Sequence, residues 1–431
     1  MATGQCPKGR NAEASILRLW EPRSVTRGPV GSEPEQISMP TDATALDFDP
    51  YLAGTDDDPY PTYSRLREEE PVYYSRKHEF YLVSRFADVQ AIARDWGRFT
   101  SARGTDIDQT GEHFGPHFIN TDPPRHETMR YLFQHRFSPK AVDESLGSLI
   151  HDQVAQLVTR IEGSPNVDVG LEFAWPLPYA IACSLMGFPS EDWQSLYDAS
   201  ARFDEREVGN SAFSLAAEEA TAELRNYVTE QAEYRRSHPG DDLMTLLVTA
   251  TVDGKPLAAD EIAGNAFMLM NAGTQTTGCL LTSALVHLGS NQEQRTWLRR
   301  NPQHVKGAVE EFLRFESPIQ YFARITTQDV ELHGTRIPAG SRVVLLSGAA
   351  NRDPGIWTHP DRLDLSRDPH RHLAFGDGIH HCIGAPVARL EARIALEALV
   401  PHLERFRLIG PPGRLRSHQL RGYVEVPAAL D

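Results

Sequence analysis

A short segment near the carboxyl end of the chain holds the residues best suited to chemistry. Residues 375–384 read FGDGIHHCIG, so a cysteine stands just before a predicted helix that has Pro386 in its first turn. The two glycines allow the backbone to bend tightly and to approach a flat ligand without a Cβ clash. Because unpaired N–H groups at a helix start favour an anion, this position suits a thiolate at Cys382.

Cys382 has three interpretations from these residues alone. A single thiolate in such a loop can bind the iron of a planar porphyrin. The thiol can instead be a small buried residue, which is the usual fate of a free cysteine. A third possibility is a metal site without haem, because five possible ligands lie within thirteen residues: His370, His372, His380, His381 and Cys382. Such a site normally adds a second cluster at ligand spacing, and the sequence contains none.

The same segment resembles the haem-binding loop of the cytochrome P450 superfamily, F-G-x-G-x-H-x-C-x-G, at every fixed position. Residues 311–314 (EFLR) resemble its E-x-x-R helix, residues 272–277 (AGTQTT) its oxygen-binding helix segment, and residues 350–354 (ANRDP) another of its landmarks. The likeness extends from about Asp58 to the end of the chain. It implies a mainly α fold with a small β component that encloses haem b (iron protoporphyrin IX). The implied activity is that of a bacterial, soluble haem-thiolate monooxygenase, which inserts one oxygen atom from O2 into a substrate.

The resemblance also assigns site residues. Cys382 is the expected iron ligand, and the haem is expected to contact Ala272, Gly273, Phe375, Gly376, His380 and Gly384. Buried haem propionates demand cationic donors. His126 and Arg130 lie four positions apart on one predicted helical face and are expected to reach the propionates together with Arg324 and His380. Glu311 and Arg314, three apart on a helix, are expected to form a buried structural ion pair.

The oxygen-binding segment departs from the family pattern at one position. Thr276 is the expected catalytic hydroxyl, and the alternative for it is a bond back to the carbonyl of Ala272. The residue before it is usually Asp or Glu, whereas this chain has Gln275, whose amide cannot exchange a proton as a carboxylate does. Water and Thr276 then relay protons alone, another carboxylate substitutes, or the enzyme is slow or uses peroxide. A haem-binding protein without turnover is the remaining alternative.

Substrate and partners follow from the same resemblance. An apolar pocket for a small organic molecule is expected at the 99–121 loop with Phe114 and Phe118, and at Leu269, Ala272, residues 318–322 and residues 420–423. No flavin fingerprint or iron–sulfur cysteine cluster accompanies the haem landmarks, so a ferredoxin and a ferredoxin reductase are the expected electron donors. A basic docking patch is expected at Arg136, Lys140, Arg389 and Arg393.

These residues must be positioned by a chain of 431 residues with a net charge of −16. The acidic balance argues against a nucleic-acid partner, and four scattered cysteines indicate a reducing cytoplasm. Periodicity predicts long helices, with short strands such as residues 80–83 and 342–346. The uncharged segment 262–292 is long enough for a membrane span, but its Asn, Gln and Thr residues favour a buried helix and no membrane. Residues 1–45 are predicted to be a disordered leader, and residues 46–431 a single catalytic domain.

Overall fold

The computed structural model describes residues 46, 48–107, 115–203, 214–367 and 369–431. The chain divides into two units, residues 1–45 and residues 46–431, and the described residues all belong to the second. The predicted leader at residues 1–45 and the predicted substrate contact Phe114 lie outside the described residues.

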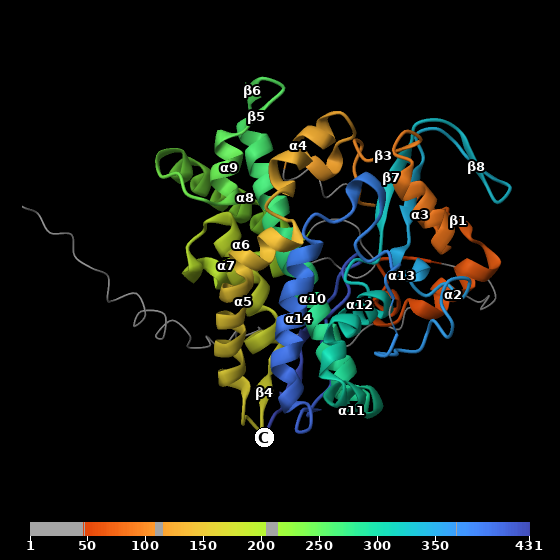
Figure 1. Cartoon of the computed structure of the whole chain (residues 1–431). Helices are drawn as coiled ribbons and strands as arrows, with labels where there is room; N and C mark the ends of the chain where they lie inside the picture. The colour runs from red at the N-terminus through yellow and green to blue at the C-terminus, as the bar shows by residue number, and fades with distance from the viewer. Residues whose placement is uncertain (1–45, 47, 108–114, 204–213, 368) are drawn as a thin grey trace, which may run out of the picture. The chain divides into compact units, whose positions relative to one another are not determined.

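Helices make up most of this unit, as predicted (Figure 1). They are α1 (Ala53–Asp57), α2 (Tyr60–Glu69), α3 (Phe86–Arg94), α4 (Arg125–Gln134), α5 (Pro139–Ile161), α6 (Pro176–Met186), α7 (Trp193–Phe203), α8 (Leu215–Ser237), α9 (Leu243–Thr249), α10 (Ala259–Ser290), α11 (Gln292–Arg300), α12 (Val305–Phe315), α13 (Ser347–Ala350) and α14 (Ala385–Leu399). Helices α5 and α10 both pack against α14.

The β component is small and mostly antiparallel. Its strands are β1 (Val72–Ser75), β2 (Phe80–Val83), β3 (Phe99–Thr100), β4 (Val167–Asp168), β5 (Thr251–Val252), β6 (Lys255–Pro256), β7 (Phe322–Thr326), β8 (Val330–Leu332), β9 (Thr335–Ile337), β10 (Arg342–Leu345), β11 (Arg407–Leu408), β12 (Gly413–Arg414), β13 (Tyr423–Glu425) and β14 (Pro427–Ala429). The largest sheet has the order β1-β2-β10-β7-β3, and only the β2–β10 pair in it is parallel.

The uncharged segment of the sequence forms most of α10, a helix of 32 residues. Its side chains are buried on most sides, since α6, α8, α9, α12 and α14 all pack against it. A helix that is apolar all round belongs in a core, so the prediction of a buried helix is confirmed. None of the helices in the described part of the chain combines the length and the hydropathy that crossing a membrane requires.

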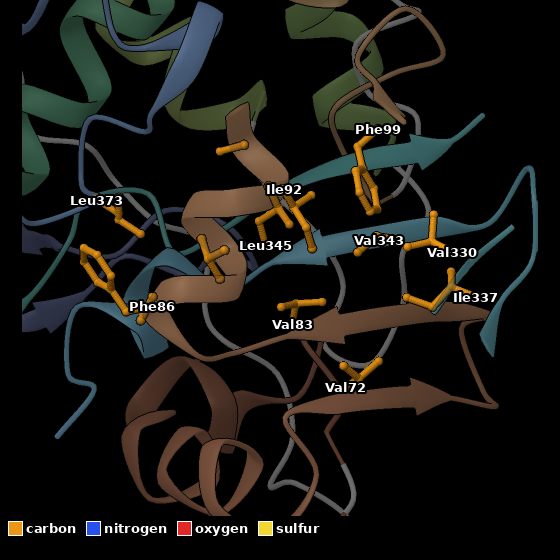
Figure 2. Close-up of a cluster of buried hydrophobic side chains, with 13 residues drawn as sticks. Val72, Val83, Phe86, Ile92, Phe99, Val330, Ile337, Val343, Leu345 and Leu373 are labelled. Atoms are coloured by element: carbon orange, nitrogen blue, oxygen red, sulfur yellow. The ribbon is translucent and has the colours of Figure 1, made fainter. Parts of the chain in front are cut away.

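Helix α3 lies across one face of the main sheet (Figure 2). Phe86 and Ile92 of α3 pack with Val83 of β2 and Leu345 of β10 in one buried cluster. Leu373 belongs to the same cluster, although it comes from the segment that leads to residues 375–384, hereafter the cysteine loop. Burial of this apolar side chain therefore anchors the start of the cysteine loop to the sheet.

A fully buried ion pair on α12 supports the same segment. The Glu311 and Arg314 side chains are both inaccessible to solvent, and the guanidinium donates to both carboxylate oxygens at 2.7 and 2.8 Å. A third donor of Arg314 reaches the carbonyl oxygen of Asn351 at 3.0 Å. The side-chain oxygen of Asn351 in turn accepts the N–H of Leu373 at 2.6 Å. The ion pair is thus connected through two hydrogen bonds to Leu373, which lies two residues before the cysteine loop.

Replacing Glu311 by Gln is expected to lower the free energy of unfolding by about 3–5 kcal/mol, because it leaves the Arg314 cation buried without its counter-charge. Urea unfolding followed by circular dichroism measures the effect. The matched control is Glu397→Gln, which breaks the partly exposed pair between Arg393 and Glu397 on α14 and should change little. Equal effects of the two substitutions would contradict a structural role for the buried pair.

Candidate functional site

The cysteine loop and the middle of α10 line one cavity. From the loop, the lining includes Phe375, Gly376, Asp377, His380, His381, Cys382, Ile383 and Gly384. From α10, it includes Met268, Leu269, Ala272, Gly273, Thr276, Thr277 and Leu280. Of the twelve residues that the sequence assigned to the site, ten therefore line this cavity, and the exceptions are His126 and Gln275.

The cysteine loop has little regular structure and is held from outside. Gly378 has a φ of +68°, and a Cβ at this position would come within 2.5 Å of the carbonyl oxygen of Ala93 in α3. Only glycine tolerates both conditions. The neighbouring Asp377 accepts hydrogen bonds from Arg94 at 2.9 and 3.0 Å and from Gln90 at 2.8 Å. Gly378 and the carboxylate of Asp377 together fix the cysteine loop against α3.

Cys382 is a free thiol that is accessible from the cavity. Its N–H donates to the carbonyl oxygen of Phe375 at 2.8 Å, which closes the loop. Burial raises the pKa of the thiol, whereas the N–H groups of Gly384 and Ala385 and the cation of Arg130 lower it. Helix α14 begins at Ala385, so the predicted helix-start effect is present, but burial outweighs it.

Four basic side chains meet at one corner of the cavity. The rings of His126 and His380 lie 4.4 Å apart between centroids, and Arg130 and Arg324 line the cavity beside His380. Neither ring nitrogen of His126 nor Nε2 of His380 has a hydrogen-bond partner among the described residues. Burial lowers the pKa of His126 to about 4, that of His380 to about 2, and that of Arg324 to about 10. This corner therefore presents buried donors that suit an anion.

The residues fit haem b. A flat macrocycle requires a wide apolar space with a single axial donor, and its two propionates require basic partners. The cavity provides Cys382 as a donor on the loop, small Ala272 and Gly273 on α10, and the basic corner of His126, His380, Arg130 and Arg324. A Cβ at Gly273 would meet no atom within 4 Å, which shows the free space at α10. Arg130 also donates to the carbonyl oxygen of His381 at 2.8 Å.

Thr276 and Gln275, the two residues predicted to take part in proton transfer, have different surroundings. Thr276 lines the cavity, and its hydroxyl donates to the carbonyl oxygen of Ala272 at 2.8 Å, which is the bond expected as the alternative to catalysis. Gln275 is buried on the side of α7, where its amide nitrogen donates to the carbonyl oxygen of Ser200 at 3.3 Å and its oxygen accepts from Asn271 at 2.9 Å. Gln275 therefore does not face the cavity.

A second carboxyl group in the cavity wall was not predicted from the sequence. Glu391 of α14 is 2 % exposed and lines the cavity, and its Oε2 has no hydrogen-bond partner in the described part of the chain. Burial raises its pKa to about 8, so it carries a proton at neutral pH. The sequence alone did not reveal it, because Val387, which lies four residues earlier and lines the same cavity, was not predicted as a cavity residue either.

Apart from Ser347, the rest of the cavity wall is apolar. It includes Phe118 and Ile119 from the predicted substrate loop, Leu269 and Met268 from α10, and Pro318, Ile319 and Phe322 from the segment before and at the start of β7. The prediction for residues 420–423 is not supported. Leu420 forms a β-bridge with Ile319 behind the wall, and Tyr423 lines a separate polar cavity beside Glu316.

The histidines around Cys382 do not form a metal site by themselves. Within the described ranges, no group of three or more His, Cys, Asp and Glu side chains is placed to hold a metal ion. His372 instead donates from Nε2 to Glu310 at 2.9 Å. The interpretation as a metal site without haem therefore finds no support among these residues.

Comparisons with known proteins point to one family. The cytochrome P450 family matches residues 210–420 of the chain. Cytochrome P450 107B1 of Saccharopolyspora erythraea is 36 % identical and covers 86 % of this chain and 94 % of its own length. Cytochrome P450 monooxygenase PikC of Streptomyces venezuelae is 35 % identical, and the match covers 86 % of this chain and 90 % of PikC. The structure of CYP109E1 from Bacillus megaterium in complex with testosterone has a TM-score of 0.81 at 28 % identity. The match covers 88 % of this chain and 99 % of CYP109E1.

Replacing Arg324 by Gln is expected to weaken haem retention by about 10-fold or more, because a charge-assisted hydrogen bond contributes about 1.5–3 kcal/mol. The measurement is the rate at which the loaded protein transfers haem to an excess of apomyoglobin. The control is Arg342→Gln on the neighbouring strand β10, where the guanidinium donates to the carbonyl oxygen of Ile107 outside the cavity. Unchanged retention in the Arg324 variant would show that the basic corner does not hold the propionates.

Proposed function

Since the chain belongs to the cytochrome P450 family, and is accordingly a haem-thiolate monooxygenase with haem b as cofactor, we propose residue roles and a substrate class for it. Cys382 is the iron ligand, and the substrate is a largely apolar organic molecule that undergoes hydroxylation or oxidative dealkylation. What supports this most strongly is a single cysteine in the wall of an apolar cavity, opposite small residues of α10 and near a corner of buried basic side chains.

Haem b, when bound, supplies the one-electron chemistry by which dioxygen is activated. The Cys382 thiolate would bind its iron. The propionates would be held by the basic corner, which consists of His126, His380, Arg130 and Arg324. The apolar walls exclude water and hold the substrate against α10, which places the reacting C–H bond near the bound cofactor.

Thr276 is the residue of α10 that would hold a proton at the cavity wall. Its hydroxyl donates to the carbonyl oxygen of Ala272 and its oxygen remains an acceptor, so it can accept a hydrogen bond from water and pass a proton on. Gln275 takes no part in this transfer, because its amide is bound to Asn271 and Ser200. The cavity wall also contains a protonated carboxyl group, that of Glu391.

The substrate pocket favours shape and hydrophobic contact over polar recognition. The substrate end of the cavity is lined by side chains that carry no charge, namely Phe118, Ile119, Leu269, Ile319 and Phe322. Burial of apolar surface then supplies most of the binding free energy. A steroid is a suitable first probe, because the similar CYP109E1 was solved in complex with testosterone.

Electrons are proposed to come from a ferredoxin and its reductase in the cytoplasm. The four residues of the expected basic patch each have an acidic neighbour: Arg136 with Asp241, Lys140 with Glu144, Arg389 with Glu310, and Arg393 with Glu397. An acidic partner must therefore compete with internal ion pairs. Docking should be weak and should weaken further with salt.

A peroxide-driven enzyme is the second candidate, and the position of Gln275 is what favours it. A family member without a carboxylate beside the catalytic threonine has one fewer proton donor for dioxygen reduction. Peroxide already carries the two electrons and the protons that this route otherwise consumes. A haem-binding protein without turnover is the third possibility, and product formation excludes it.

Turnover with isotopic oxygen separates these functions. With testosterone as probe, after confirmation that it shifts the haem spin state, we expect NADPH, ferredoxin reductase and ferredoxin to give product that contains ¹⁸O from ¹⁸O2. Thr276→Ala should lower product formed per NADPH about 10-fold or more, since a positioned proton donor contributes about 10²–10⁴ in rate. Peroxide-driven product should persist in this variant.

The matched control is Thr274→Ala, because Thr274 is also a threonine of α10 and its hydroxyl bonds to the carbonyl oxygen of Asn271 away from the cavity. Its coupling should remain close to that of the wild type. Product only with peroxide, in a protein that a ferredoxin reduces normally, would reject the dioxygen route. No product from any bound probe under either condition would favour the haem-binding alternative.

A further inference from the structure

A group of three side chains, two of them buried, lies beside the cysteine loop and does not line the cavity. Glu310 of α12 accepts two hydrogen bonds from Arg389 of α14, Nε to Oε1 at 2.8 Å and Nη2 to Oε2 at 2.9 Å. It also accepts a hydrogen bond from Nε2 of His372 at 2.9 Å. The Glu310 and His372 side chains are 8 % and 2 % exposed, whereas that of Arg389 is 38 % exposed.

The protonation of this group follows from its hydrogen bonds. Nδ1 of His372 accepts the N–H of Ala374 at 3.2 Å, so Nε2 carries the proton that is donated to Glu310. The two donors hold the pKa of Glu310 at about 2 despite its burial, so the carboxylate is charged at neutral pH. Within the group, the Glu310 carboxylate and the Arg389 guanidinium are one anion and one cation that balance each other.

The group is in direct contact with the loop that carries the cysteine. The Arg389 guanidinium lies over the Phe375 ring at 4.4 Å from its centroid. The carbonyl oxygen of Phe375 accepts the N–H of Cys382 at 2.8 Å. Arg389 therefore lies against the residue whose carbonyl oxygen holds the backbone of Cys382, which brings its positive charge close to the sulfur. The carboxylate of Glu310 both fixes this guanidinium and neutralises its charge.

We propose that Glu310 is a positioning residue that sets the reduction potential of the haem iron through its ion pair with Arg389. Reduction adds one electron, and a nearby uncompensated cation stabilises that added negative charge. With Glu310 ionised, the charge of Arg389 is balanced, and the iron stays harder to reduce. The inference rests on the proposed ligation of the iron by Cys382.

Loss of the Glu310 charge should make the iron easier to reduce. In the haem-loaded Glu310→Gln variant, which keeps the size and hydrogen-bonding capacity of the side chain, we expect the equilibrium constant for one-electron reduction to rise several-fold. Each factor of ten corresponds to a potential about 59 mV more positive. A dye-mediated spectroelectrochemical titration of the substrate-free protein, without any electron-transfer partner, measures this potential.

A second variant separates charge from structural damage. In Glu310→Gln/Arg389→Gln the group is again neutral, so the potential should return toward that of the wild type although more contacts are lost. A merely structural role predicts the opposite, a double variant displaced at least as far as the single one. If Glu310→Gln does not retain haem, Arg389→Gln alone still tests the inference, because removal of the cation should shift the potential to more negative values.

The matched control is Glu397→Gln, which frees Arg393 on the same helix as Arg389, and its potential should match that of the wild type. An unchanged potential in Glu310→Gln, or a double variant shifted as far as the single one, would overturn the inference. The carbon monoxide spectrum of the reduced wild-type protein is recorded first. If it lacks the signature of thiolate ligation, the proposed function fails before any comparison of variants begins.

Discussion

A single cysteine must be held at the wall of a buried cavity, and most of the surrounding structure serves that constraint. The cysteine loop contains only one turn of 3-10 helix, at Gly378–His380, so its own backbone cannot fix the sulfur. Helix α3 holds it through Asp377, the α12 ion pair holds its approach through Asn351, and α14 begins just after it. Each support comes from a different part of the sequence, which is why the fold must be complete before the site exists.

At two places in the cavity, burial shifts pKa values in a direction that the charges of a bound haem would offset. Burial raises the pKa of Cys382 in spite of the helix start beside it, so the thiol alone is a weak acid. Burial lowers the pKa values of His126 and His380, so this corner cannot easily hold more positive charge without an anion. A cation at the sulfur and carboxylates at the basic corner relieve both conditions. Because haem carries both an iron cation and carboxylates, one cofactor satisfies both places, and this explains why these residues lie in one cavity.

The sequence predicts the site well where function depends on local spacing. The cysteine loop and the position of Thr276 are short segments whose chemistry follows from neighbouring residues, and the long uncharged run of α10 needed only periodicity. Prediction fails where residues far apart in the chain combine. Helix α6 was not predicted, because its PLPYAIACSLM sequence holds two prolines and no amphipathic period. Nothing in the sequence indicated that Gln275 would bind Ser200, or that Glu310 would meet both His372 and Arg389.

Ligation of the iron by Cys382 is the central claim, and the spectrum of the reduced protein with carbon monoxide tests it most directly. The wild type should show the strongly red-shifted Soret band of thiolate-bound haem, and Cys382→Ala should lose it. Cys183→Ala removes another free thiol, buried in α6, and should retain the band. A Soret band of the histidine-ligated type in the wild type, or a red-shifted band that survives in Cys382→Ala, would contradict the claim.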